Sequence, residues 1–137
     1  MKYLTGIQAL NIPCSLNTAG DWHQSALQWN TLQIADSQDS LWGDYGIEGP
    51  KTVPEHQEMI YVANHIRALL DMLYLQDFSN CKGMRRDYID NDSYNIELFE
   101  QVYKMRKLPY WNLIDKFMEK EYMLRWLNYK EVHNNEG

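Results

Sequence analysis

The chain has 137 residues, of which 45% are apolar, and its 13 basic and 19 acidic residues give a net charge of −6. This length and composition predict a single domain (residues 1–137) with an ordered core. Residues 1–50 hold one lysine and five acidic residues, so they repel phosphates; this argues against direct nucleic-acid binding and favours a basic protein partner.

Targeting and membrane signals are absent from the sequence. No run approaches the roughly 20 apolar residues that a membrane span needs, so we expect no membrane association. The first residues do not resemble a signal peptide. Cys14 and Cys81 are far apart and have no metal-binding spacing, which is typical of free cysteines in a cytoplasmic protein.

Residues 1–53 have no sustained helical period and predict an irregular layer with room for short strands. Residues 7–12 and 32–35 are the candidate strands, the first ended by Pro13. Residues 17–21 predict a turn, after which residues 22–29 suit either a short helix or an extended segment. Residues 42–50 form a glycine-punctuated aromatic stretch that also suits a small hairpin.

Two aromatic and acidic patches in this layer are candidate binding sites. The first consists of Asp21, Trp22 and His23 with Trp29 downstream, and the second of Trp42, Asp44 and Tyr45. Trp and Tyr supply broad, rigid contact area, so one interpretation is a recognition surface with outward-facing indole rings. The other is that the Trp side chains anchor a poorly packed segment onto the helices.

The sequence from residue 54 onward predicts a helical scaffold (residues 54–131). Thr52 and Glu55 have the spacing of a capping box, with Pro54 in the first turn, and predict a helix over residues 54–77. Its apolar arc is very wide, which indicates a central helix contacted from several sides. His65 falls on that arc, where a hydrogen-bonded core histidine is the expectation.

A narrow polar stripe remains on the predicted central helix. Asn64, Arg67 and Asp71 are spaced i, i+3 and i+7, so they share one face. The ordinary interpretation is a solvated stripe with an Arg67–Asp71 pair. The functional alternative is a small polar binding site covered by the N-terminal layer.

Two more helices are predicted after a turn at residues 79–83, where Gly83 suits a left-handed conformation. Residues 84–90 suit a short helical turn. Asp92 or Ser93 can cap a helix over residues 94–107, and Pro109 can begin another over residues 109–131, followed by a polar tail (residues 132–137).

Glu121 and Arg125 are exceptions on the last predicted helix, because both fall within its apolar arc. Their i, i+4 spacing allows them to pair with each other. They suit either a polar contact with the front half or a partner, or a pair that reaches solvent at the helix end.

Catalytic signatures are absent from the sequence: there is no phosphate-binding glycine loop, HExxH, CxxC or GxSxG motif. Asp21 and His23 form a D-x-H pair that His56 or Asp44 could complete as a metal site, but the pattern arises easily by chance. A Cys14–His23 nucleophile pair is weaker still. We therefore expect no metal and no cofactor.

The sequence as a whole predicts a mainly α-helical fold, a three-helix open bundle with an irregular N-terminal layer; short β-strands in that layer, and so an α+β fold, are the alternative. For function it favours a non-catalytic protein-binding module, for example a toxin-neutralising (antitoxin-like) or inhibitory protein of a bacterial conflict system. The first alternative is a small metal-dependent or acid–base hydrolase that uses Asp21, His23 and the polar stripe. The second is a structural homo-oligomer with Trp126 and Tyr129 buried at a two-fold contact.

Overall fold

The N-terminal half builds a small mixed β-sheet, seen in a computed structural model that describes residues 1–18 and 27–133. The strands are β1 (Lys2–Leu4), β2 (Ile34–Asp36), β3 (Ile47–Lys51) and β4 (Ile60–Ala63), in the spatial order β2-β1-β4-β3. β1 pairs antiparallel with β2 and parallel with β4, and β3 pairs antiparallel with β4. The fold is therefore mixed α+β, and the short strands for which the N-terminal layer left room form a small sheet.

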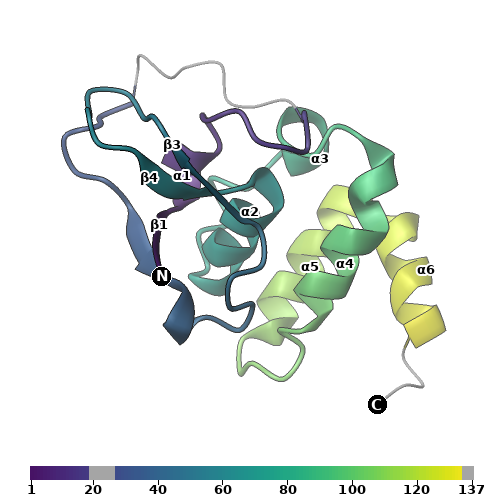
Figure 1. The fold of residues 1–137 in the computed structure, drawn as a ribbon. Helices are drawn as coiled ribbons and strands as arrows, with labels where there is room; N and C mark the ends of the chain where they lie inside the picture. The colour runs from purple at the N-terminus through teal and green to yellow at the C-terminus, as the bar shows by residue number, and fades with distance from the viewer. Residues whose placement is uncertain (19–26, 134–137) are drawn as a thin grey trace.

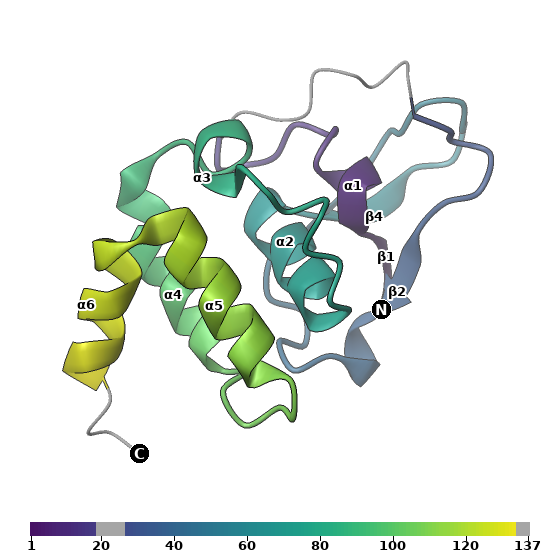
Figure 2. The ribbon, with the colours of Figure 1, turned by 180° about the vertical axis from the view of Figure 1, so that it is seen from behind.

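Helices are stacked in layers on one side of the sheet. Helix α2 (His65–Tyr74) lies against the sheet, α4 (Asn95–Tyr103) and α5 (Trp111–Tyr122) lie beyond it, and α6 (Leu124–His133) is outermost (Figures 1 and 2). Shorter turns complete the described chain: α1 (Gly6–Ala9), α3 (Met84–Asp87), and the 3-10 turns η2 (Ser37–Asp39) and η3 (Asp92–Tyr94). The layering confirms that the helix in the middle of the chain is central.

That central helix is shorter than the sequence predicts. Residues 60–63 form strand β4, and the helix begins after Asn64, whose side-chain oxygen accepts a hydrogen bond from the backbone N–H of Arg67. The prediction of a helix start at Thr52 is wrong; Glu55 has φ of 64°, outside the helical region. The run Ile60-Tyr61-Val62 favours a strand, and pairing with β1 and β3 decides the outcome.

The N-terminal predictions were partly right. Residues 34–36 form a strand close to the predicted 32–35, and residues 47–51 form half of a hairpin with β4. Residues 6–9 are helical, so the strand expected over residues 7–12 is wrong. The first strand is β1, in which Tyr3 and Leu4, on opposite faces of the sheet, are both buried.

The predicted third helix is broken in two. Met123 has φ of 51°, which ends α5 and starts α6 at a new angle. The predicted Glu121–Arg125 pairing is therefore absent from the described contacts. Glu121 Oε1 accepts hydrogen bonds from the backbone N–H groups of Gly83 and Met84. Arg125 instead forms an ion pair with Asp92, with Nη2 and Oδ2 3.6 Å apart. Gly83 has the predicted left-handed conformation, with φ of 80°, and precedes the expected short helix α3.

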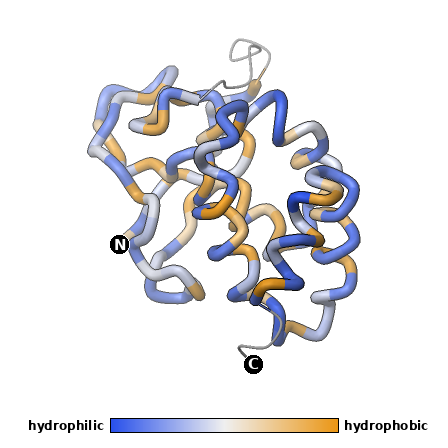
Figure 3. The backbone as a smooth tube through the Cα atoms, turned by 90° about the vertical axis from the view of Figure 1, so that its right-hand side faces the viewer, coloured by the Kyte–Doolittle hydropathy of each residue, from blue (hydrophilic) through white to orange (hydrophobic). Residues whose placement is uncertain are grey.

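The core runs through all the layers. Phe99 packs edge-on against Tyr122 and Trp126, and Tyr129 stacks on Trp126. Trp126 and Tyr129 are thus buried within one chain, and their burial needs no second copy. In Figure 3 the hydrophobic stretches gather in the middle of the molecule, where sheet and helices meet. No helix in the described part of the chain is long and apolar enough to cross a membrane.

Candidate functional site

A buried arginine joins the sheet, α2 and the aromatic loop of residues 42–46. Arg67 is fully buried on the first turn of α2. Its Nη1 donates to the backbone carbonyls of Gly43, at 2.7 Å, and Tyr45, at 2.5 Å, and its Nη2 donates to the Tyr3 hydroxyl at 2.9 Å. Its guanidinium also lies 4.9 Å from the centroid of the Tyr3 ring. One side chain therefore fixes three segments that are distant in sequence.

Asp71 provides the opposite charge one helical turn later. Its Oδ1 accepts from Arg67 Nε at 3.1 Å, and its Oδ2 accepts from the hydroxyls of Tyr3 and Thr5, each at 2.7 Å. Burial raises the pKa of the Tyr3 hydroxyl, and the Asp71 carboxylate raises it further, so Tyr3 stays protonated and able to donate. The network is well satisfied internally, as buried charges require.

The polar stripe is therefore structural. The expectation of a solvated stripe is wrong, because Asn64, Arg67 and Asp71 are all buried. The N-terminal layer covers them, as the functional alternative predicted. Their polar atoms, however, form hydrogen bonds with other groups of the same chain. Arg67 and Asp71 thus hold β1, the loop of residues 42–46 and α2 together.

The aromatic loop fits closely over the start of α2. The Gly46 carbonyl accepts from the backbone N–H of Asn64 at 2.7 Å. A Cβ at Gly46 would lie 2.7 Å from Arg67 Cβ, and the residue has φ of +75°, so both space and backbone conformation require glycine. Tyr45 is half-buried and its hydroxyl donates to Glu97 on α4, while Asp44 is exposed.

Trp29 and Trp42 are anchors. Trp29 is 2% exposed and Trp42 7% exposed, so the expectation that these indole rings face outward is wrong. The indole N–H of Trp42 donates to the backbone carbonyl of Gln101 on α4 at 3.1 Å. The indole ring packs edge-on against the Tyr74 ring, with ring centroids 6.2 Å apart. Trp22 and His23, and the Asp21 of the D-x-H pair, lie outside the described residues.

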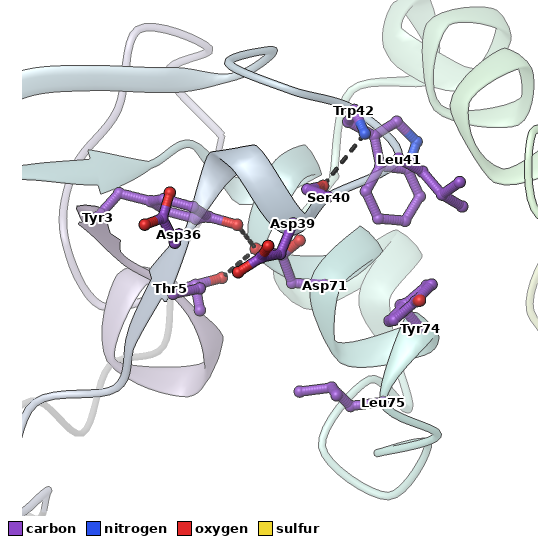
Figure 4. Close-up of a pocket in the computed structure, with 11 residues that line it drawn as sticks. Tyr3, Thr5, Asp36, Asp39, Ser40, Leu41, Trp42, Asp71, Tyr74 and Leu75 are labelled. Atoms are coloured by element: carbon purple, nitrogen blue, oxygen red, sulfur yellow. Dashed lines mark hydrogen bonds between the residues drawn. The ribbon is translucent and has the colours of Figure 1, made fainter. Parts of the chain in front are cut away.

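A groove opens beside this network, between η2 and the end of α2 (Figure 4). We call it the acidic groove. Its cavity of about 170 Å³ has Tyr3, Thr5 and Asp71 at its base, and its remaining lining comes from Ala35, Asp36, Asp39, Ser40, Leu41, Trp42, Tyr74 and Leu75. A second hollow of about 180 Å³ continues it past Ile34 and Asp77.

Among the described residues, the lining of the acidic groove includes aspartates and no basic side chain. Asp71 is neutralised by Arg67, and Asp36 accepts from the Met1 amino group and the Gln38 backbone N–H. The backbone N–H of Gln38 and the Met1 amino group hold the pKa of Asp36 below its usual range. Asp39 is exposed and makes no ion pair or side-chain hydrogen bond with any described residue.

Apolar side chains flank these charges. Leu41 is 50% exposed and Leu75 is 73% exposed, while Tyr74 presents part of its ring. Large exposed apolar side chains gathered around a concavity are typical of contact sites. Of the residues proposed from sequence, Trp42 and Asp71 line the groove. The sequence analysis singled out neither Asp39 nor Leu41, because no motif marks residues 36–41.

A second polar cluster joins the start of α2 to the N-terminal segment. His65 Nε2 lies 3.0 Å from the Ile12 carbonyl, which can only accept, so Nε2 carries the proton; Nδ1 lies 2.8 Å from the Thr18 hydroxyl. His65 is therefore the hydrogen-bonded core histidine that was expected. Burial raises the pKa of the Cys14 thiol, but interaction with His65 outweighs burial and sets that pKa below its ordinary value.

Of the metal ligands considered from sequence, His56 has another partner: its Nε2 lies 2.7 Å from the Trp29 carbonyl oxygen. Asp44 is exposed, and Asp21 and His23 lie outside the described residues. Within the described residues, Cys14 interacts with His65. Within residues 1–18 and 27–133, no three potential metal-binding side chains come together. Comparison of the chain with protein-family models, with curated proteins and with solved structures gives no match.

Proposed function

We propose that this chain is a protein-binding module whose acidic groove receives a basic segment of a partner protein. The observation that carries the proposal is the Asp39 carboxylate, which has no partner among the described residues and lies at a concave surface flanked by exposed apolar side chains. Lysine and arginine have apolar stems and charged heads. Such a side chain can pack its stem on Leu41 and Leu75 while its head pairs with Asp39.

Hydrogen bonds hold several lining residues of the acidic groove in place, which supports binding of a specific partner. The Arg67–Asp71 network fixes Tyr3 and Thr5 at its base, and Trp42 is held by α4. A preorganised surface loses less conformational entropy on association. The excess of acidic residues in the chain also speeds encounter with a basic partner. A toxin-neutralising or other inhibitory protein is one form that such a module can take.

Titration with defined peptides tests this proposal. The isotope-labelled protein is titrated with a soluble peptide of alternating arginine and leucine, and separately with a glutamate–leucine peptide of equal length, while backbone amide resonances are followed. We expect the basic peptide to shift resonances of residues 34–42 and 71–75. Asp39→Asn should weaken binding about three- to fivefold, as expected for loss of an exposed ion pair of up to about 1 kcal/mol.

Asp44→Asn is the matched control, because Asp44 is also exposed but lies outside the lining of the acidic groove. It should leave the affinity for the basic peptide unchanged. Equal binding of both peptides, or equal effects of the two variants, would contradict the proposal.

A further inference from the structure

A second groove, opposite in charge to the first, lies between α5 and the connection from α2 to α3. We call it the lysine groove. Its volume is about 570 Å³, within the range of small-molecule sites. Lys82 contributes from the connection, and Lys116 and Lys120 contribute from α5.

The charges of the three lysines are not neutralised by acidic side chains of the described residues. All are exposed, and none forms an ion pair or side-chain hydrogen bond with a described residue. Lys116 and Lys120 are one helical turn apart, an arrangement of like charges that slightly destabilises an isolated helix. Glu121 is the one acidic side chain among the described lining residues, and its Oε1 already accepts from the Gly83 and Met84 backbone N–H groups. The lining therefore keeps a net positive charge in a chain of net charge −6.

The floor of the lysine groove is apolar. Phe78 and Phe117 pack against each other with ring centroids 5.4 Å apart, and Leu113 is 49% exposed beside them. An apolar floor with a cationic rim complements a molecule that has an apolar chain and an anionic head. It also disfavours a fully hydrated anion, which would leave the exposed Leu113 uncovered.

We propose that the lysine groove binds a small amphipathic anion, a carboxylate with an aliphatic chain. The chain covers Leu113 and the Phe78–Phe117 pair, and the head pairs with the ammonium groups of Lys116 and Lys120. The size of the groove favours a small ligand over a macromolecular partner. This inference is independent of the acidic groove and of the function proposed for it.

The test compares three probes that share a twelve-carbon chain. Dodecanoate, dodecyl maltoside and dodecyltrimethylammonium are each titrated below their micelle concentrations, followed by calorimetry and by amide resonances of residues 78–84 and 113–121. We expect dodecanoate to bind at least tenfold more tightly than either of the other two. Its affinity should fall as salt screens the lysines.

Variants locate the site. Lys116→Gln combined with Lys120→Gln should weaken dodecanoate binding at least fivefold, and Leu113→Ser should weaken it about threefold. Lys104→Gln combined with Lys107→Gln, at two exposed lysines that follow α4, is the matched control and should have no effect. All of these side chains are exposed, so the variants are expected to fold.

Several outcomes would overturn the inference. One is the absence of dodecanoate binding; another is equal affinity for the neutral or cationic probe. A third is an unchanged affinity in the double variant of Lys116 and Lys120. If dodecanoate fails while an acidic amphipathic peptide shifts the same resonances, the groove is a protein-docking surface and the small-ligand proposal is wrong.

Discussion

Arg67 and Asp71 form an ion pair inside the molecule, with Arg67 Nε 3.1 Å from Asp71 Oδ1 and Arg67 fully buried. Each partner makes further hydrogen bonds to segments far away in sequence, namely β1 and the loop of residues 42–46. The pair therefore joins sheet, loop and helix, and it shapes the base of the acidic groove.

Replacing Arg67 should strongly destabilise the fold. Arg67→Met leaves Asp71 without its counter-ion and leaves the Gly43 and Tyr45 carbonyls without a donor. We expect a loss of about 3–5 kcal/mol in the free energy of unfolding, measured by urea denaturation. Arg85→Met is the control, because Arg85 is partly exposed and its Nε lies 3.7 Å from Asp92 Oδ1. This variant should lower the free energy of unfolding by under about 1 kcal/mol. A similar small loss for Arg67→Met would show that the network contributes little.

Gly46 and Gly43 should respond differently to alanine. Both have positive φ, but a Cβ at Gly46 would lie 2.7 Å from Arg67 Cβ, whereas a Cβ at Gly43 would meet no atom of the described residues within 4 Å. Gly43→Ala should destabilise the protein by about 1 kcal/mol, through backbone conformation alone. Gly46→Ala should cost at least about 1–3 kcal/mol more, through overpacking. Equal losses in thermal unfolding would mean that the loop moves freely away from α2.

Trp42 should behave as an anchor. Trp42→Ala removes a buried indole, and we expect it to lower the free energy of unfolding by about 3–5 kcal/mol. Leu41→Ala, at the exposed neighbouring position, should change stability by under about 0.5 kcal/mol. Denaturation of both variants checks this. If the Trp42→Ala protein is as stable as wild type and loses only peptide affinity, Trp42 is part of a recognition surface and is not an anchor.

The two cysteines should differ in reactivity. Burial raises the pKa of Cys81, and Asp77 and Glu121 raise it further, whereas the pKa of Cys14 lies below its ordinary value. Since the thiolate is the reactive form, Cys14 should be alkylated by iodoacetamide at least tenfold faster near neutral pH, as followed by mass spectrometry of the native protein. His65→Gln should move the midpoint of Cys14 alkylation to higher pH. An unchanged midpoint would show that His65 does not lower the pKa of Cys14.

Glu48 should make stability depend on pH. Burial raises the pKa of Glu48, but hydrogen bonds from Lys51 and Ser15 outweigh it, so the folded-state pKa lies below the ordinary value. The stabilisation is present above the unfolded-state pKa of about 4.3 and is lost as pH falls through the folded-state value. Wild type should exceed Glu48→Gln in stability by about 1 kcal/mol at pH 7, and the difference should shrink in acid. A pH-independent difference in urea denaturation would contradict this.

Local signals in the sequence determined several features correctly. The turn at Gly83, the short helix after it and the core placement of His65 follow from side-chain chemistry within a few residues. The central position of α2 follows from its wide apolar arc, because an arc of that width needs neighbours on several sides. Helix α4 also lies within the predicted range.

Only the tertiary structure decided the rest, since long-range pairing outweighs local preference. Residues 60–63 become a strand because β1 and β3 supply their hydrogen-bond partners, which no local pattern reveals. A helical wheel places Asp71 on the solvent-facing side of the helix. In the structure Asp71 is buried, and its carboxylate accepts hydrogen bonds from Tyr3 and Thr5, which are 66 or more positions away in sequence. The acidic groove arises from the same long-range contacts, so its residues share no sequence motif.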